Sequence, residues 1–303
     1  MKDSIRNPLE LKRLEPLDEA GLPPNVLTVD VEEWYHVNYR SADPSRFDTS
    51  VSTAYDNTME ILDVLNRIGS KATFFVLGSV AREYPGLVRA ISKEGHELAC
   101  HSDSHTLIYE QSASEFRDGL RRAVEAISSQ SGEKVSGFRA PSCSITERNP
   151  WALDVLCEEG FLYDSSVFPI RNYMYGVAGF PLRPCVLTTA GGGRLMEIPL
   201  PVLDFGPLRI PCGGGVYLRM LPAPLLRRLI SRAHSRGRVF MLYFHPSDID
   251  TRHYRMPLSL RESFFHNVGR RGARRKIMNL LSEHTWTSIS DAYSSPLSEL
   301  RGG

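Results

Sequence analysis

Short apolar segments alternate with longer amphipathic segments along most of this chain. Each apolar segment predicts a buried strand, and the segments between them repeat apolar residues at helical spacing. This alternation favours βαβ units, and therefore a parallel sheet or barrel. The predicted strands are residues 25–29, 71–77, 97–100, 135–138, 160–163, 239–244 and 285–289, and the predicted helices are residues 52–68, 80–93, 112–128, 150–159, 225–235 and 263–281.

Residues with chemically useful side chains lie at or just past the ends of the predicted strands. They are Asp30, His101, Arg139, Asp164 and His245. In parallel α/β folds the carboxyl ends of the strands meet at one rim, where binding and catalysis occur. We therefore expect these five side chains to gather around one rim.

The chain has 303 residues, of which 42% are hydrophobic, which is enough for one large α/β domain or two smaller ones. A stretch rich in Gly and Pro interrupts the alternation and predicts an insertion that covers the rim, with a hairpin joining residues 186–189 to 195–198. The expected divisions are an N-terminal arm (1–24), a barrel (25–290) containing the rim insertion (170–222), and a tail (291–303).

The composition of the chain indicates the cellular compartment and the kinds of binding partner to expect. A formal net charge of +1 gives no reason to expect nucleic acid as a partner. The five cysteines include no CxxC pair, so they predict reduced thiols rather than a disulfide framework or a zinc ribbon. The start has no signal-peptide core, and no apolar run reaches 18 residues. These features predict a cytoplasmic protein, with a position against a membrane surface left open.

His101 and His105 are four residues apart just after a predicted strand. At this spacing both imidazoles can bind one ion, although two polar loop residues would give the same pattern. The HExxH motif of zinc proteases is absent. Hydrolysis of an amide at a metal site needs three protein ligands, a carboxylate base and a proton donor. Asp30, Glu32 and His245 supply the missing residue types.

Four motifs together resemble the polysaccharide deacetylases, the NodB-homology group called carbohydrate esterase family four. They are TVDVEEW at 28–34, HSDSH at 101–105, FRAPS at 138–142 and LYFHP at 242–246, in the order of that family. The resemblance covers about residues 26–290 and is strongest to the subgroup that accompanies exosortase-linked exopolysaccharide clusters. It implies a distorted (β/α)7-type, TIM-like barrel with a rim insertion and a C-terminal extension of helices and a strand.

The resemblance also implies roles for single residues. Asp30 matches the general base of the family, and Arg139 matches the arginine that orients this base. His101 and His105 match two metal ligands, and His245 matches the general acid.

One departure from the family concerns the third metal ligand. Most members have two adjacent aspartates, but Val31 follows Asp30 here and cannot bind a metal. Alternate residues of a strand share a face, so Glu32 can point where Asp30 points, whereas Glu33 points away. We therefore predict Glu32 as the carboxylate ligand.

The backbone N–H of Ser142 matches the group that completes the oxyanion hole of the family. A DxDW-like motif after the fifth strand is missing, and Asp164 stands nearby. From its place near this point, we expect Asp164 to orient His245.

Trp34, Tyr217 and Arg219 are candidates for binding a sugar. Trp34 follows the acidic cluster and can either stack on a sugar or pack in the core. Tyr217 and Arg219 follow the second glycine triplet and can line the sugar site.

Between Arg219 and Lys276 there are fourteen Lys and Arg residues against three acidic residues. Such a run is usually a solvated helix face. The alternative is a patch for anionic lipid headgroups or for a glycan on a lipid pyrophosphate carrier. The densest part consists of Arg270, Arg271, Arg274, Arg275 and Lys276.

The sequence thus predicts a hydrolase that removes N-acetyl groups from amino sugars of a glycan. Zn²⁺ is the expected ion, and iron, cobalt or manganese would suit the same ligands. Two alternatives stay open at this point: an amidohydrolase for a small non-sugar amide, and a non-catalytic protein of this fold that binds glycan or lipid.

Overall fold

The computed structural model describes residues 9–170, 175–205, 208–252, 254 and 256–302. Strands and helices alternate over most of this length, as the hydrophobic pattern predicts. The strands are β1 (Arg13–Pro16), β2 (Asn25–Val31), β3 (Thr73–Val76), β4 (Glu97–Cys100), β5 (Gly137–Phe138), β6 (Tyr163–Asp164), β7 (Cys185–Thr188), β8 (Arg194–Glu197), β9 (Val202–Phe205), β10 (Leu208–Pro211) and β11 (Phe240–Phe244). The helices are α1 (Ala54–Arg67), α2 (Gly78–Glu83), α3 (Pro85–Lys93), α4 (Ala113–Ser131), α5 (Trp151–Glu158), α6 (Gly215–Met220), α7 (Ala223–His234), α8 (Leu260–Asn267), α9 (Arg270–Glu283), α10 (Ile289–Ala292) and α11 (Ser294–Arg301).

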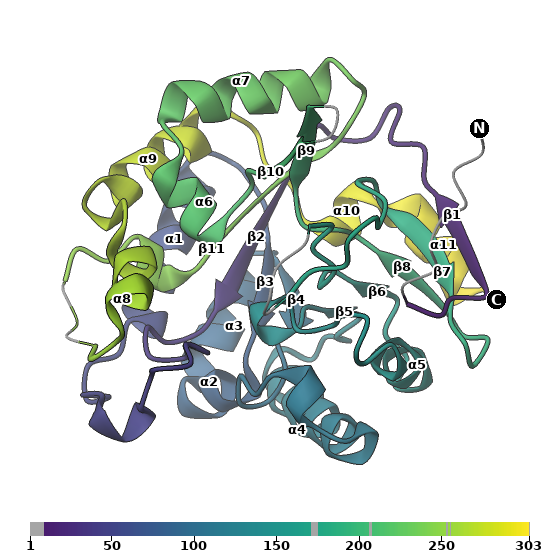
Figure 1. The fold of residues 1–303 in the computed structure, drawn as a ribbon, viewed down its shortest axis with the longest axis horizontal. Coiled ribbons are helices and arrows are strands. Elements are labelled where there is room, and N and C mark those ends of the chain that lie inside the picture. The colour runs from purple at the N-terminus through teal and green to yellow at the C-terminus, as the bar shows by residue number, and fades with distance from the viewer. Residues whose placement is uncertain (1–8, 171–174, 206–207, 253, 255, 303) are drawn as a thin grey trace.

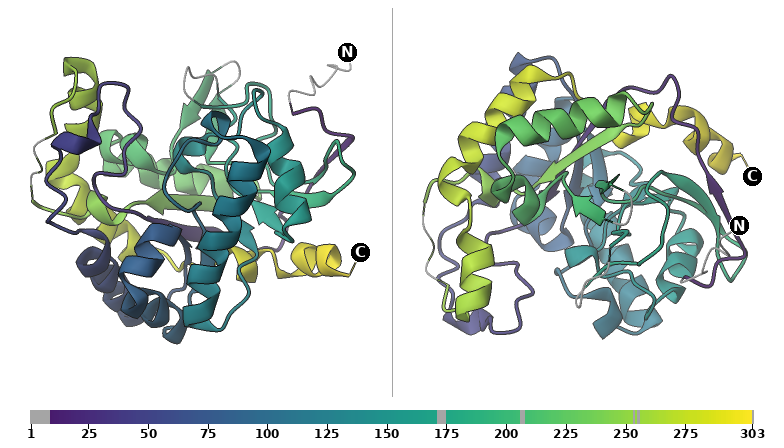
Figure 2. Two further views of the ribbon diagram at one scale, coloured as in Figure 1. Left: turned by 90° about the horizontal axis from the view of Figure 1, so that it is seen from below. Right: turned by 45° about the horizontal axis from the view of Figure 1, so that its top comes forward.

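A curled sheet forms the centre of the fold (Figure 1). Within the described residues it has nine strands in the order β1-β7-β8-β6-β5-β4-β3-β2-β11. Every neighbouring pair from β8 to β11 is parallel, whereas β7 and β1 extend the β8 side in antiparallel pairing. Helices surround the outer side of this half-barrel (Figures 1 and 2). The predicted α/β barrel-like fold is therefore confirmed.

Strand β2 shows how the sequence places side chains on the two faces of the sheet. All seven of its residues are buried, as expected for a parallel strand covered on both faces. Val29 and Val31 pack in the core cluster shared with the helices, and Val26 packs in the second cluster on the other face. Burying one such side chain contributes about 1.5–3 kcal/mol. The alternation directs Asp30 toward the hollow of the curled sheet.

Two predicted helices are each divided in the structure. The predicted helix 80–93 is α2 and α3, because Pro85 has no N–H to donate and Tyr84 before it has non-helical backbone angles. The predicted helix 263–281 is α8 and α9, which are separated at Gly269. This glycine has φ +74°, a left-handed conformation that ends a helix.

The region 170–222 contributes to the sheet as well as to the rim. The predicted hairpin forms from β7 and β8, and β8 pairs with β6, so residues 185–197 extend the sheet instead of lying over it. Strands β9 and β10 form a separate two-stranded sheet, and α6 follows them. Residues 171–174 and 206–207 lie outside the described residues.

Both ends of the chain differ in part from expectation. In the arm, β1 pairs with β7 and Leu9 is buried, so the part of 1–24 that the structure describes joins the main sheet. The predicted strand 285–289 is reduced to one bridge between Val26 and Thr287, because α10 begins at Ile289. None of the helices in the described ranges combines the length and the apolar character that crossing a bilayer requires.

Candidate active site

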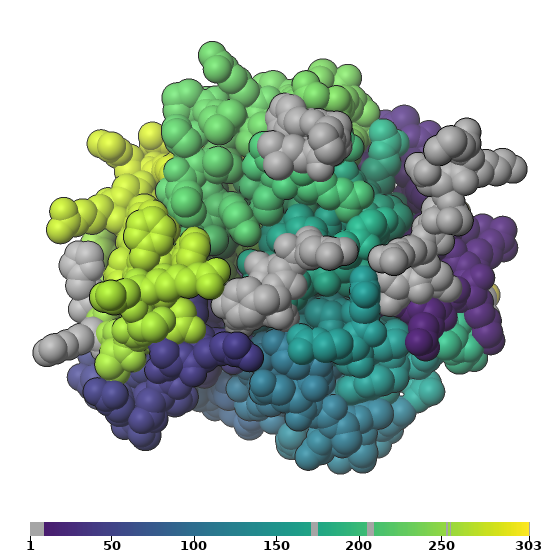
Figure 3. Space-filling view, viewed as in Figure 1, coloured from purple at the N-terminus to yellow at the C-terminus, as the bar shows by residue number. Residues whose placement is uncertain are grey.

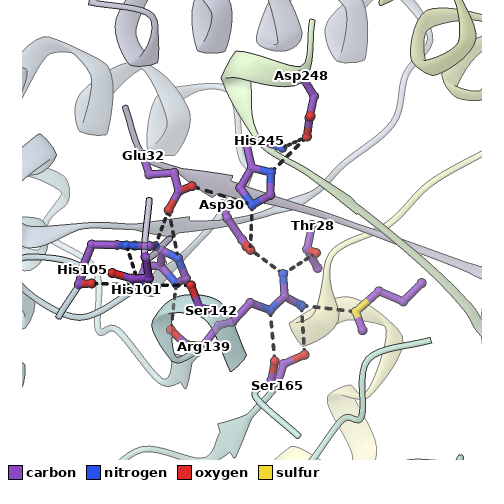
Figure 4. Close-up of polar contacts among 12 residues, drawn as sticks. Thr28, Asp30, Glu32, His101, His105, Arg139, Ser142, Ser165, His245 and Asp248 are labelled. Carbon is purple, nitrogen blue, oxygen red and sulfur yellow. Dashed lines mark hydrogen bonds and ion pairs between the residues drawn. The ribbon is translucent and has the colours of Figure 1, made fainter. Parts of the chain in front are cut away.

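Strand β2 delivers two carboxylates to the hollow of the sheet (Figure 4). Asp30 lies in the strand, and Glu32 follows its last residue and points to the same side. Glu33 turns the other way, and its Oε2 accepts a hydrogen bond of 2.7 Å from the backbone N–H of Thr53, just before α1. The two-residue alternation of a strand therefore separates the roles of three acidic residues.

Two histidines meet Glu32 at the end of β4. Oε2 of Glu32 lies 2.6 Å from Nε2 of His105 and 3.5 Å from Nε2 of His101. All three residues are buried, and one ligand atom from each lies within 4.8 Å of the others. The structure thus brings together the three residues that the sequence predicted as a metal site.

The hydrogen bonds of these residues suit a bound cation. Nδ1 of His101 lies 2.8 Å from the carbonyl oxygen of Arg139, which can only accept, so the proton of a neutral imidazole lies on Nδ1. Its Nε2 lone pair then faces the buried Glu32 Oε2, 3.5 Å away. Two acceptors that face each other need a cation between them. A set of two imidazoles and one carboxylate fits Zn²⁺ and other divalent transition metals.

The pKa of Glu32 is consistent with an ionised ligand. Burial alone would raise this pKa, but the neighbouring His105 and His245 outweigh burial and hold it well below its ordinary value. The carboxylate is therefore charged when it faces the two histidines.

Asp30 is fixed by Arg139, which comes from the end of β5. Nη1 of Arg139 donates to Asp30 Oδ1 and to Thr28 Oγ1, both at 2.7 Å. Its Nη2 and Nε donate to the side chain and the carbonyl of Ser165, at 2.9 and 3.1 Å. The guanidinium also lies over the ring of Phe75, 4.1 Å from its centroid. Arg139 is 1% exposed, so these contacts hold one orientation of Asp30.

His245 follows β11 and faces both carboxylates. Its Nε2 lies 4.0 Å from Asp30 Oδ2 and 3.8 Å from Glu32 Oε1, and its Nδ1 lies 3.0 Å from Asp248 Oδ2. Burial alone would lower its pKa, but Glu32, Asp248 and Asp30 together raise it to about 9. His245 therefore carries a proton at neutral pH.

The expectation that Asp164 orients His245 is wrong. Asp164 is fully buried, where it accepts a 2.5 Å hydrogen bond from Ser166 and is the register partner of Glu197 on β8. Burial raises the pKa of Asp164 to about 6 and that of Glu197 well above its ordinary value. The two carboxyl groups therefore share protons with each other, and Asp248 takes the place beside His245.

The loop after β5 has an unusual backbone. Ser142 and Cys143 have φ values of +49° and +54°, and His105 has +60°. Such conformations cost about 1 kcal/mol or more for residues other than glycine, and they cluster at functional sites. Asn38 lies between these two loops, and its side-chain amide is 3.0 Å from Ser142 Oγ and 3.3 Å from His105 Nδ1.

A cavity of about 500 Å³ opens over the metal-site residues and includes Ser142 in its wall. Residues of α6 and α8 line the cavity, as does Tyr39, and the backbone N–H of the next residue, Arg40, donates to Glu262 of α8. Figure 3 shows α8 in yellow-green directly above the purple segment near Arg40. Asp30, His245 and Arg139 border the same cavity.

The three predicted sugar-binding residues also border the cavity, in different ways. Trp34 is 3% exposed and stacks on Tyr254 with ring centroids 4.4 Å apart, so it is packed into the wall. Tyr217 lies edge-on to Phe168. Arg219 is tied to Asp248 by an ion pair of 2.9 Å.

The basic run in α9 does not form one exposed face. Nζ of Lys276 donates to three backbone carbonyls around the end of α6, and Arg270 points to the cavity and donates to Ser247 O. Arg274 pairs with Glu60. Arg271 and Arg275 are exposed. The structure gives no support to the predicted membrane patch.

Sequence reasoning missed Asp248, Ser165 and Asn38. Asp248 stands three residues after His245, which precedes a helical turn. At this spacing an acidic side chain can accept a hydrogen bond from the backbone N–H of the residue before the turn. That signal was present in the sequence. Asn38 and Ser165 carry no comparable signal, because their partners come from distant loops.

Two family models match different parts of the chain. Residues 45–155 match the model described as polysaccharide deacetylase, and residues 165–294 match one described as a domain of unknown function (DUF3473). The chain is 33% identical over 150 residues to the peptidoglycan-N-acetylglucosamine deacetylase of Bacillus cereus, covering 46% of this chain and 53% of that protein.

A second relative is the peptidoglycan-N-acetylglucosamine deacetylase PgdA of Listeria monocytogenes, 35% identical over 91 residues, or 30% of this chain and 20% of that protein. The chain therefore spans about half or less of the length of these curated relatives. Over nearly full length, the fold matches a crystal structure from Mycobacterium smegmatis described as a candidate polysaccharide deacetylase. The TM-score is 0.62, with 23% identity, and the match covers 97% of this chain and 96% of that chain. These matches relate residues 45–155 to the polysaccharide deacetylase model, and the structural match shows a similar fold over nearly the full length.

Proposed function

We propose that this protein is a metal-dependent hydrolase that removes N-acetyl groups from amino sugars of a polysaccharide or of its lipid-linked precursor, in exopolysaccharide biosynthesis. One observation carries the proposal. The cluster of Glu32, His101 and His105 lies between a carboxylate that an arginine holds in place, Asp30, and a protonated histidine, His245. Relatives named as peptidoglycan deacetylases support the same type of reaction.

Each residue has a defined task in this reaction. Glu32, His101 and His105 would hold a divalent ion, which supplies Lewis acidity that polarises the amide carbonyl and acidifies water. Asp30 takes a proton from the attacking water at Oδ2, because Arg139 occupies Oδ1. His245 donates the proton of Nε2 to the departing amine nitrogen.

The oxygen of the amide carbonyl gains negative charge during the attack. We assign the stabilisation of that charge to the backbone N–H of Ser142, a residue of the cavity wall in the loop after β5. Such a donor typically contributes a factor of about 10²–10³ to the rate.

Acetate release tests the proposal. The wild-type protein is incubated with chitotetraose and, separately, with acetamide, and acetate is measured beside Asp30→Asn and His245→Asn. We expect acetate from chitotetraose only, and a decrease of about 10²-fold or more in each variant. Acetamide cleavage with an inert glycan would assign the protein to small amides, and an Asp30→Asn variant that keeps every measurable function would make it a binding protein.

A further inference from the structure

Two arginines, Arg219 and Arg270, line one end of the cavity close to Asp248. Arg219 binds Oδ1 of Asp248 at 2.9 Å. The other oxygen, Oδ2, accepts hydrogen bonds of 3.0 Å from the backbone N–H and from Nδ1 of His245. Asp248 is thus already paired with Arg219 and His245, and Arg270 makes no ion pair with it within the described structure.

Arg270 is the second arginine, and it lacks a carboxylate partner within the ranges that the structure describes. Its Nη2 donates to the carbonyl of Ser247 at 3.1 Å, and its side chain lines the cavity. Burial lowers its pKa, yet a guanidinium keeps its charge at every physiological pH. A partly buried charge without a directly paired carboxylate is unfavourable, and an anion in the cavity would reduce that cost.

The neighbouring acidic residues have other partners. Asp250 is held by Arg252, Asn57 and Tyr254. Glu262 accepts hydrogen bonds from Ser41, from Ser259 and from the backbone of Arg40. Within the described residues, neither of these carboxylates forms an ion pair with Arg270.

The cavity walls around Arg270 offer apolar and aromatic surface for a sugar ring. His266 and Tyr39 border the cavity at this end, with ring centroids 5.9 Å apart. Burial lowers the pKa of His266 to about 4, so this ring is neutral. Phe265 and Tyr217 add apolar and aromatic surface on which a sugar ring can rest. The anion site and the proposed catalytic residues are parts of one cavity.

We propose that Arg270, supported by Arg219, binds an anionic group carried by the glycan substrate, a carboxylate or a phosphate, beside His245. This inference rests on the proposed function for the identity of the neighbouring sugar. It narrows the substrate class from any N-acetylated glycan to an acidic glycan or a sugar phosphate. A bidentate contact from a guanidinium suits either group.

Binding measurements with matched probes test the inference. Isothermal titration calorimetry compares N-acetylglucosamine 1-phosphate with N-acetylglucosamine, and a hyaluronan tetrasaccharide with chitotetraose. The wild-type protein is expected to bind at least one acidic probe about tenfold or more tightly than its neutral match. A preference for the phosphate or for the carboxylate identifies which anion the site takes.

Variants assign the preference to Arg270. Arg270→Gln is expected to remove the preference for the acidic probe without weakening the neutral one, and Arg270→Lys is expected to retain part of it. The control is Arg271→Gln, one residue further along α9 and exposed, which should behave like wild type. Thermal unfolding of each variant shows whether it is folded.

Three results would overturn the inference: no preference in the wild-type protein, the same preference in Arg270→Gln, or an equal loss for acidic and neutral probes. The last would mean that Arg270 only supports the structure. Binding is measured without turnover, so these results are independent of acetate release. A protein that prefers the acidic probe but releases no acetate would reject the proposed function and keep the anion site.

Discussion

Asp248 binds His245 through two hydrogen bonds of 3.0 Å, one from the backbone N–H and one from Nδ1 of the ring. Arg219 holds the opposite oxygen of the same carboxylate. Because Nδ1 donates to Asp248, Nε2 is the atom that can transfer a proton, and it is the atom that faces Asp30 and Glu32. Asp248 thus acts on the reaction through His245, as a positioning residue.

This arrangement predicts how activity depends on pH. The pKa of His245 is raised to about 9, so the proton-donating form is present below that pH and is lost above it. Deacetylation is therefore expected to decline as pH rises through about 9. In Asp248→Asn the carboxylate charge that favours protonated His245 is gone, so the decline should move to lower pH. Rates of acetate release between pH 5 and 10 provide the measurement, with a decrease of about tenfold or more expected at pH 9.

Asp250→Asn is the matched control for this experiment. Asp250 lies two residues further along the chain and binds Arg252 and Tyr254 rather than His245. Its replacement should lower stability without moving the alkaline decline. An Asp248→Asn profile that falls uniformly at every pH would show that Asp248 has a structural role only.

Asn38 is expected to couple the metal-site loop to the oxyanion loop. It contacts His105 Nδ1 and Ser142 Oγ with one amide group. Partners that hold the second nitrogen of a ligand histidine typically change metal affinity or activity by about 10–100-fold. Asn38→Ala should therefore weaken metal binding and lower the rate together, as measured by metal titration and by acetate release.

A double-mutant cycle with Ser142→Ala examines this coupling. If Asn38 positions Ser142, the two changes together should cost less than the sum of their separate effects on the rate. Effects that simply add would show that the two loops act independently. The control is Asn66→Ala, which removes the side-chain amide of an exposed residue on α1, away from both loops.

Much of the site could be predicted because it depends on regular features of strands. The carboxyl ends of β2, β4, β5 and β11 meet at one rim in any parallel sheet, and this places Asp30, His101, Arg139 and His245 together. The two-residue period of a strand was enough to separate Glu32 from Glu33.

The failures concern partners that are set by tertiary contacts. Asp164 faces Glu197 because β8 joins the sheet next to β6, whereas the many Gly and Pro residues of this region predicted an inserted loop. Likewise, Arg270 turns into the cavity because α8 and α9 are separate helices that meet at Gly269. A basic run in one predicted helix could not reveal that two of its members point inward.

Two glycines predict opposite effects on stability. A Cβ atom on Gly137 would lie 2.0 Å from Cζ of the buried Tyr163, so Gly137→Ala must displace a core ring and should cost about 1–3 kcal/mol or more. At Gly272, inside α9, no atom lies within 4 Å of the added Cβ. Gly272→Ala should therefore stabilise the protein by about 0.5–1 kcal/mol. Urea unfolding measures both changes, and a neutral Gly137→Ala would contradict the packing of β5 against β6.

Metal content gives the most direct prediction for the three clustered residues. Glu32→Ala, His101→Ala and His105→Ala each remove one of the three ligand atoms that lie within 4.8 Å of one another. Each variant is expected to lose most of the metal that the wild-type protein retains after dialysis, because a site with two ligands binds far more weakly than one with three. Mass spectrometry of the purified proteins measures the bound ion and identifies it.

Asp30→Asn separates metal binding from catalysis in the same experiment. Asp30 is held by Arg139 at Oδ1, and in the proposed reaction its other oxygen takes a proton rather than binding the ion. The variant should therefore keep its metal and lose its activity, whereas the ligand variants lose both. If Glu32→Ala kept a full equivalent of metal while Asp30→Asn lost it, the two carboxylates would exchange roles. Asp30, two residues before Glu32 and on the same side of the chain, would then be the carboxylate ligand.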